Sequence, residues 1–442
     1  MAEMSDVRPI GVVGAGPCGL AACKVLGESG LEVECLEAGD RVGGVWNLER
    51  QPSGAYRSLH TNTSTRAMAF SDFPFPDGAT TYPSARELQA YFEAYASRFG
   101  LHDHIRFGER VTRAHPLDGG GWRVEAAGGD ARDYRALVVA SGQYVAPRWP
   151  SPGTPGTFSG ERLHVFDYFD PTTPIDCRGK RVVVVGLGSS AAELASELCD
   201  AASPLGCAER VILSARSGRW VVPKMVGGVP IDHNGAHPAD PLPDELKALA
   251  PAEREAFVRR MFGAGIRGIA EQAGAFDGLG LPEPTIEPWQ ERPTMSMEFI
   301  PALKKGRIEV RPDIARFDGH AVEFTDGSRV EADVIVYATG YTLSFPFLSE
   351  DVLGCEASEL ALYRYIAHAD HDDLFFVGCQ RVTCSMWPLA EQQSLWIARR
   401  LTGEFALPDA SERLRSARSL AHSDPVLCSL YADELRCDTG RS

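Results

Sequence analysis

The sequence lacks long hydrophobic runs and a surplus of basic residues. No segment reaches about 18 consecutive apolar residues, so no transmembrane helix is expected. The net charge of −16 argues against nucleic acid and against an anionic membrane as partners. The N-terminal segment MAEMSDVRPIG has no basic stretch followed by an apolar one, so we expect no signal peptide and a cytoplasmic protein.

Cysteine motifs are also missing. The 11 cysteines are scattered along the chain, and no two of them form a CxxC pair. No cysteine and histidine set has the spacing of a zinc site, so no bound metal is expected. We therefore expect most of the cysteines to be reduced thiols that behave as small buried hydrophobic residues.

Residues 10–46 follow the pattern of a dinucleotide-binding unit, with a buried strand, a glycine-rich turn, a helix and a second strand. Gly14 permits the tight turn, Gly16 lets the backbone approach a pyrophosphate, and Gly19 lets the helix pack on the strand. Glu37 ends the second strand, where a carboxylate accepts hydrogen bonds from ribose hydroxyls and repels a 2′-phosphate. The site is predicted to take an unphosphorylated ribose, as in FAD or NAD.

Residues 181–199 repeat this pattern, with Gly186, Gly188 and Ala191 at the three fingerprint positions. The strand that follows does not end on an acid. It runs into Arg216, a residue type that accommodates a 2′-phosphate. The second site is therefore predicted to bind NADPH.

The order of these units predicts an α/β protein with two Rossmann-like dinucleotide-binding domains, one inserted into the other. The FAD-binding domain is expected to cover residues 1–155 and 293–442, and the NADPH-binding domain residues 156–292. A β-meander is expected from residue 307 onwards. Helices are expected at about 84–99, 243–262, 264–274, 387–401 and 410–421.

One motif and three further segments carry a family resemblance. Phe158, Gly160, His164 and Tyr168 satisfy the pattern F-x-G-x-x-x-H-x-x-x-Y/F. The segments LHTNTS, SARSGRW and ATGY lie at residues 59–64, 214–220 and 338–341. On these matches the chain resembles the flavin-containing monooxygenase family, a group of class B flavoprotein monooxygenases. Related Baeyer–Villiger enzymes usually have Trp where this chain has Tyr168.

The resemblance implies a monooxygenase that depends on NADPH and O2. In this family NADPH reduces FAD, and the reduced flavin reacts with O2 to give a C4a-hydroperoxide. One oxygen then passes to a nucleophilic nitrogen or sulfur of a small molecule. Amines, indoles and thioethers are the substrate classes implied, by N-oxidation, N-hydroxylation or S-oxidation.

The resemblance also implies the residues of the site. Asn62 is expected at the interface of flavin and NADP+ as the catalytic side chain, because an amide donates and accepts hydrogen bonds without offering an acidic proton. His164 and Tyr168 are expected to have structural roles. The expected FAD-side residues are Gly14, Gly16, Gly19, Glu37, Val45, Trp46, Thr61, Asn62, Thr63, Thr339 and Gly340. The expected NADPH-side residues are Gly186, Gly188, Ser189, Ser190, Ala191, Glu193, Arg216 and Ser217.

Two other reactions of flavoproteins are alternatives to oxygenation of nitrogen or sulfur. Baeyer–Villiger oxidation of a ketone needs a peroxide anion and usually an arginine against it, and no motif singles out such an arginine. A flavin disulfide reductase needs a redox-active cysteine pair near its flavin, usually CxxC, which is absent. The residues leave the substrate and the oligomeric state open, a homodimer included.

Overall fold

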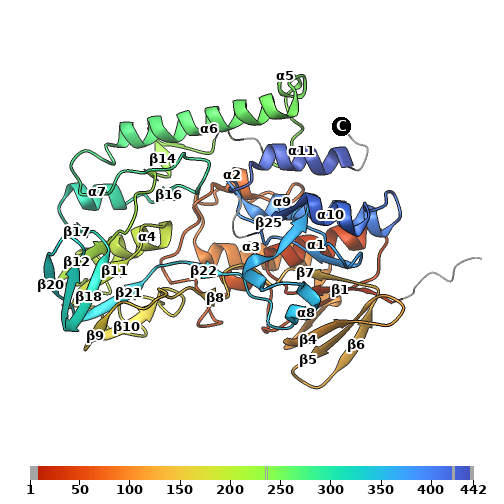
Figure 1. The fold of residues 1–442 in the computed structure, drawn as a ribbon, viewed down its shortest axis with the longest axis horizontal. Coiled ribbons are helices and arrows are strands. Elements are labelled where there is room, and N and C mark those ends of the chain that lie inside the picture. Colours follow the sequence, from red (N-terminus) through yellow and green to blue (C-terminus); the bar gives the residue numbers. More distant parts are fainter. Residues whose placement is uncertain (1–7, 234, 236, 421–423, 439–442) are drawn as a thin grey trace, which may run out of the picture.

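The computed structural model describes residues 8–233, 235, 237–420 and 424–438. Two α/β halves lie side by side in it (Figure 1). The first half contains a parallel sheet of strand order β24-β7-β1-β2-β3. Its strands are Ile10–Val13 (β1), Val33–Glu37 (β2), Ile105–Phe107 (β3), Ala136–Val139 (β7) and Leu374–Phe376 (β24). β1, β7 and β24 are fully buried, which explains their nearly continuous apolar sequences.

The helices of the first half begin where their local sequence predicts. α1 starts directly after the first glycine turn and packs along α9. α3 starts with the predicted capping box of Ser84 and Glu87. α11 also packs on α9 and has no counterpart among the predicted helices. These helices are Pro17–Glu28 (α1), Ala85–Arg98 (α3), Met386–Leu401 (α9), Ala410–Ser416 (α10) and Cys428–Asp438 (α11).

The second half contains a parallel sheet of order β10-β21-β11-β12-β17. Its strands are Glu161–His164 (β10), Arg181–Val185 (β11), Arg210–Ser214 (β12), Ile308–Arg311 (β17) and Val334–Tyr337 (β21). α4 (Ser189–Leu198) follows β11 through the second glycine turn. The predicted meander is present as a further sheet of Gly156–Phe158 (β9), Ile314–Gly319 (β18), Ala321–Phe324 (β19) and Arg329–Glu331 (β20).

The sheet membership of β17 and β21 corrects the predicted domain boundary. We expected the chain to return to the first domain at residue 293. Instead both strands belong to the second sheet, and β21 lies between β10 and β11. The first sheet gains its last strand only at β24. A buried apolar strand carries no local signal of which sheet it joins, because strand pairing is decided by distant partners.

The long helix over the second half is a second correction. α5 (Asp244–Lys247) is one turn, and α6 (Pro251–Ala273) runs without a break where two helices were expected. Pro251 occupies the first turn, where it is tolerated. Gly263 lies inside α6 because a Cβ there would be 2.7 Å from the ring of Trp289. That close packing offsets the roughly 1 kcal/mol that a glycine costs within a helix.

The remaining elements are short. They include the antiparallel strands Val111–Pro116 (β4), Trp122–Ala126 (β5) and Ala131–Tyr134 (β6), the paired strands Ala146–Pro147 (β8) and Tyr341–Thr342 (β22), and the helices Thr65–Met68 (α2), Phe299–Lys304 (α7) and Glu350–Leu353 (α8). Among the described residues, no helix combines the length and the apolar character that crossing a bilayer requires.

Candidate functional site

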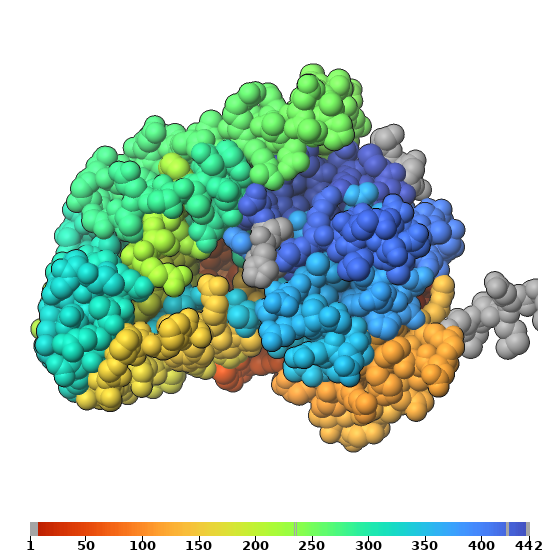
Figure 2. Space-filling model, viewed as in Figure 1, coloured from red at the N-terminus to blue at the C-terminus, as the bar shows by residue number. Residues whose placement is uncertain are grey.

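A cavity of about 1990 Å³ lies between the two halves, where the space-filling view shows a recess (Figure 2). The residues that follow the parallel strands of both sheets line it, which is where α/β sheets bind ligands. Its lining includes the expected FAD-side residues Gly14, Gly16, Glu37, Val45, Trp46, Thr61, Asn62, Thr63, Thr339 and Gly340. It also includes the expected NADPH-side residues Gly186, Gly188, Ser189, Ser190, Arg216 and Ser217. The fold thus gathers segments from distant parts of the chain around one space.

The turn between β1 and α1 is too crowded for side chains at two of its glycines. Gly14 has φ +101°, and a Cβ there would lie 2.9 Å from the carbonyl oxygen of Ala140. A Cβ on Gly19 would lie 1.8 Å from the carbonyl oxygen of Gly14. Gly16 is roomier, with the nearest atom at 3.6 Å. The turn therefore has no side chains over its amides at these positions, as a pyrophosphate cradle requires.

Glu37 braces this turn from the end of β2. The carboxylate is buried and accepts hydrogen bonds from the amides of Ala15 (2.7 Å) and Gly39 (2.6 Å). Arg50 donates to it at 3.2 Å. A carboxylate offers about four acceptor positions, so one remains for a ribose hydroxyl. Arg50 also lines the cavity and was not singled out from the sequence.

Asn62 lies on a loop that lines the same cavity as the two glycine turns. Its Oδ1 atom is buried and has no hydrogen-bond partner within the described part of the chain. An unsatisfied buried acceptor costs about 1–3 kcal/mol, which a ligand that donates to it would recover. Thr61 Oγ1 donates to the carbonyl oxygen of Thr63 at 2.9 Å, which holds the loop in a turn around Asn62.

The second half holds this loop in place. Lys224 is buried and donates to the carbonyl oxygen of Thr61 at 2.9 Å, and it also pairs with Glu193. Tyr56 donates to the other carboxylate oxygen of Glu193 at 2.8 Å. Glu193 is absent from the cavity lining. The contact of Glu193 with NADPH stays a prediction; in the structure its carboxylate binds Lys224 and Tyr56, and Lys224 in turn holds the carbonyl oxygen of Thr61.

The second glycine turn repeats the first, with alanine in place of the third glycine. Gly186 has φ +128°, and a Cβ there would lie 2.6 Å from the carbonyl oxygen of Ala338. The Cβ of Ala191 stands 3.8 Å from that position, so alanine fits where the first turn needs Gly19. At Gly188 the nearest atom is Arg219 Nη1, at 3.9 Å.

Arg216 follows β12 at the wall of the cavity. Its side chain is exposed, and no ion pair involves it among the residues that the structure describes. An exposed, unpaired guanidinium at this strand end suits a 2′-phosphate.

The four residues of the spaced motif lie outside the cavity lining. His164 is buried, and its Nδ1 accepts from the amide of Phe166 at 3.1 Å. Burial, together with the charge of Arg148, lowers the pKa of His164 to about 4, against a hydrogen bond to the backbone of Gly340 that favours the charged form. The imidazole is thus neutral near pH 7.

The other members of the motif pack the second half. Tyr168 donates to Glu197 at 2.9 Å and meets the ring of Tyr56 edge-on. A Cβ on Gly160 would lie 2.4 Å from the carbonyl oxygen of Asp333, so the approach of β10 to the chain before β21 requires glycine. Phe158 packs on the ring of Phe317. The structural roles expected for His164 and Tyr168 stay a prediction, to which these packing contacts are relevant.

Basic residues dominate the charged lining, although the chain as a whole is acidic. Among the described residues, the lining contains three carboxylates, those of Glu37, Glu291 and Asp313. It contains seven arginines: Arg50, Arg110, Arg148, Arg216, Arg219, Arg292 and Arg381. Such a surface fits two pyrophosphates and a 2′-phosphate. The crowded glycines, the unpartnered Asn62 and this charge together fit FAD and NADPH.

Comparison with known proteins decides the family. The sequence profile described as flavin-binding monooxygenase-like matches residues 7–234 and 279–426. The chain belongs to the flavin-binding monooxygenase-like family. It is 30% identical over 429 residues to human flavin-containing monooxygenase 2, covering 92% of this chain and 75% of that protein. It is 28% identical over 428 residues to rat flavin-containing monooxygenase 3, covering 92% of this chain and 76% of the relative.

Solved structures share the fold. An oxidised steroid monooxygenase bound to NADP superposes with a TM-score of 0.71 at 21% identity, covering 98% of this chain and 97% of that one. The S-allyl-L-cysteine S-oxygenase of Allium sativum gives 0.69 at 21% identity, covering 98% and 89%. The predicted family, the α/β class with two Rossmann-like units and the cofactors FAD and NADPH are thereby confirmed. The protein is an FAD- and NADPH-dependent monooxygenase.

Proposed function

We propose that this monooxygenase transfers one oxygen from O2 to a nucleophilic nitrogen or sulfur of a small molecule. The observation that supports the proposal is the buried Oδ1 of Asn62, which has no hydrogen-bond partner among the described residues and belongs to a residue that lines the same cavity as both nucleotide cradles. Bound FAD, once reduced by NADPH, supplies the oxygen-activating chemistry. The remaining tasks, which are binding, orientation and exclusion of water, fall to the side chains of this chain.

The two cradles take different nucleotides. The turn of Gly14, Gly16 and Gly19 holds the pyrophosphate of FAD, and Glu37 accepts from its ribose. The turn that begins at Gly186 holds the pyrophosphate of NADPH. Arg216 and Ser217 bind its 2′-phosphate.

Asn62 orients the reacting groups at the junction. Its Oδ1 accepts a hydrogen bond and its Nδ2 donates one, so it can hold two partners without releasing an acidic proton. His164, the histidine of the family motif, is neutral at pH 7 and outside the cavity lining. Neither residue delivers a proton that would discharge the activated oxygen as hydrogen peroxide.

The apolar part of the cavity is the proposed substrate end. Trp46 and Trp387 both line it and meet edge to face, with ring centroids 6.1 Å apart. Met68 and Met386 line it as well. Aromatic and thioether side chains favour an uncharged amine, indole or thioether group next to the flavin.

Baeyer–Villiger oxidation of a ketone is a second candidate. One observation favours it: the cavity contains arginines, such as Arg292 and Arg381, that no motif had singled out. Cyclohexanone monooxygenase also has a similar fold, with a TM-score of 0.69 at 20% identity, covering 97% of each chain.

A substrate screen tests the proposal. NADPH oxidation by the purified yellow protein would be followed against amines, indoles, thioethers and ketones, with the mass of every product. We expect products heavier by one oxygen from the nitrogen and sulfur compounds. Esters or lactones from the ketones, with no N- or S-oxide, would move the assignment to the second candidate. NADPH consumption without any oxygenated product would contradict both.

A further inference from the structure

The charged lining of the cavity includes Arg381, an arginine from the half opposite to the NADPH cradle. Arg381 follows β24, the last strand of the first sheet, and precedes α9. It lines the same cavity as Gly188 and Ser189 of the second turn. Within the described residues its guanidinium makes no hydrogen bond or ion pair.

Three more arginines lie near it. Arg219 stands next to the second turn, with Nη1 3.9 Å from the position of a Cβ on Gly188, and it pairs with Glu291. Arg292 donates to the hydroxyl of Tyr144 at 3.0 Å. Arg148 donates through Nε and Nη2 to the carbonyl oxygen of Thr339, at 2.9 and 2.7 Å. These three side chains thus have hydrogen-bond or ion-pair partners, whereas the guanidinium of Arg381 has none in the part of the chain that the structure describes.

The four guanidinium groups repel one another. Burial lowers the pKa of Arg219 to about 10, and the charges of Arg381, Arg292 and Arg148 act in the same direction. Burial and the charge of Arg292 also lower the pKa of Arg381, although the carboxylate of Asp424 acts in the opposite direction. Clustered like charges in a partly buried place favour a bound anion, and Arg219 lies beside Gly188, the N-cap of α4, where anions bind.

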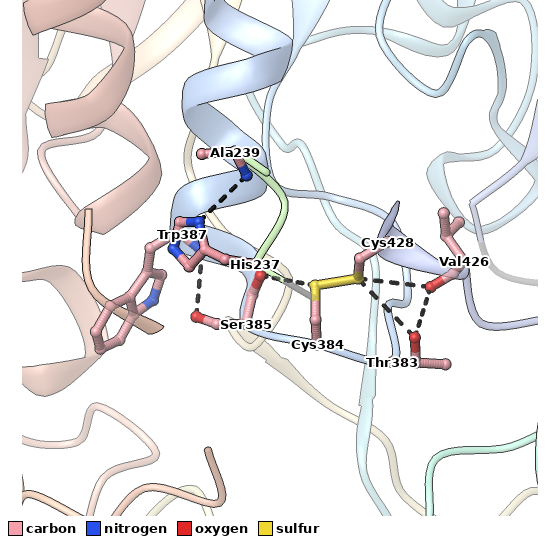
Figure 3. Close-up of a disulfide and its surroundings, with 8 residues drawn as sticks. All are labelled: His237, Ala239, Thr383, Cys384, Ser385, Trp387, Val426 and Cys428. Carbon is pink, nitrogen blue, oxygen red and sulfur yellow. Dashed lines mark hydrogen bonds between the residues drawn. A yellow bond between two sulfur atoms is a disulfide. The ribbon is translucent and has the colours of Figure 1, made fainter. Parts of the chain in front are cut away.

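The backbone of Arg381 is fixed by the C-terminal segment. Its carbonyl oxygen accepts from the amide of Val426 at 2.8 Å, and the amide of Thr383 donates to the carbonyl oxygen of Val426 at 3.0 Å. A disulfide joins Cys384 to Cys428 directly beyond this pairing (Figure 3). The loop therefore presents Arg381 from a braced backbone.

We propose that Arg381 is a positioning residue that reaches from the first half to bind the pyrophosphate of the nicotinamide dinucleotide held by the second half. The inference rests on the NADPH cradle of the proposed function. Arg216 reads the 2′-phosphate, which only NADP+ carries, whereas Arg381 would read the pyrophosphate, which NADP+ and NAD+ share. Binding of the dinucleotide would thus join the two halves across the cavity.

The test is an equilibrium titration of the oxidised, FAD-loaded enzyme with NADP+ and with NAD+, followed by calorimetry. R381A is expected to weaken both dinucleotides by a similar factor, about 10- to 100-fold, the loss expected for a charge-assisted hydrogen bond. R216A should weaken NADP+ alone. R381K should fall between R381A and the parent enzyme, because lysine keeps the charge and loses the planar fork.

Two controls keep the result specific. R178A removes an exposed arginine that pairs with Asp176 away from the cavity, and it should leave both affinities unchanged. FAD content and Tm, measured for each variant, separate a binding defect from misfolding. Unchanged NADP+ and NAD+ affinity in folded R381A would overturn the inference. The titration measures dinucleotide binding and does not depend on oxygen transfer. It can therefore be interpreted even if the enzyme does not oxygenate nitrogen or sulfur compounds.

Discussion

The two glycine turns have similar backbone conformations, but the strand that follows each turn leads to a residue of different chemistry. In both turns the first glycine abuts a carbonyl oxygen of a neighbouring strand end, at Ala140 or at Ala338. Glu37 after the first turn is buried and holds three donors, whereas Arg216 after the second is exposed and has no ion pair in the described chain. We propose that the shared geometry binds a pyrophosphate and that the residue at the strand end decides which ribose is accepted.

The largest effect is expected from a substitution in the first turn, compared with a substitution at the equivalent position of the second turn. G19A would place a Cβ 1.8 Å from the carbonyl oxygen of Gly14, a backbone clash that no rotamer relieves. We expect loss of FAD and a clear drop in Tm, with a destabilisation of about 3 kcal/mol or more. A191G in the second turn should cost only about 1 kcal/mol, the helix penalty of glycine. Similar FAD content and Tm in the two variants would refute this difference between the turns.

The second prediction concerns Asn62, which lines the same cavity as both turns. N62A removes the amide proposed to hold the reacting groups. We expect FAD content to stay unchanged, while the hydrogen peroxide released per NADPH oxidised rises about tenfold, as expected for loss of one positioned hydrogen-bonding group. Peroxide would be measured with a coupled peroxidase assay beside NADPH absorbance. Unchanged peroxide yield with a good substrate would remove Asn62 from the site.

A smaller effect is expected in the pH dependence of stability, through His164 in the second half. The pKa of His164 is lowered by burial to about 4 from an ordinary value of 6.5. As pH falls below about 6.5, the histidine is protonated in the unfolded chain but stays neutral in the folded one. The free energy of unfolding therefore decreases between about pH 6.5 and pH 4. H164Q should flatten this part of the profile of Tm against pH, measured by calorimetry. An identical slope in the variant would show that His164 does not cause it.

Much of this arrangement could be predicted because its signals are local. A buried strand, a glycine turn and a helix are contiguous in sequence, so both nucleotide units and the end residues Glu37 and Arg216 were found from the chain alone. The capping box at Ser84 is equally local. The family motif was also found, and the packing of His164 and Tyr168 agrees with the roles expected for them.

What could not be predicted depends on distant partners. β17 and β21 join the second sheet through pairing with β12 and with β10 and β11, which their own sequences do not encode. The disulfide links cysteines 44 positions apart without a motif, although most cysteines are free as expected. The arginines at 148, 219, 292 and 381 come from four separate segments and meet only in the fold. The family resemblance predicts a contact between Glu193 and NADPH, but it does not predict the ion pair that Lys224 forms with the Glu193 carboxylate.

The rates at which NADPH and NADH reduce the bound flavin test directly whether Arg216 selects NADPH. Anaerobic stopped-flow absorbance would give both rates at low dinucleotide concentration for the parent enzyme and for R216A. We expect the parent enzyme to prefer NADPH by about 10- to 100-fold, the value of a charge-assisted contact to the 2′-phosphate. In R216A the preference should collapse to near unity. Equal rates in the parent enzyme, or a preference that survives in R216A, would contradict the assignment of the second strand end to NADPH.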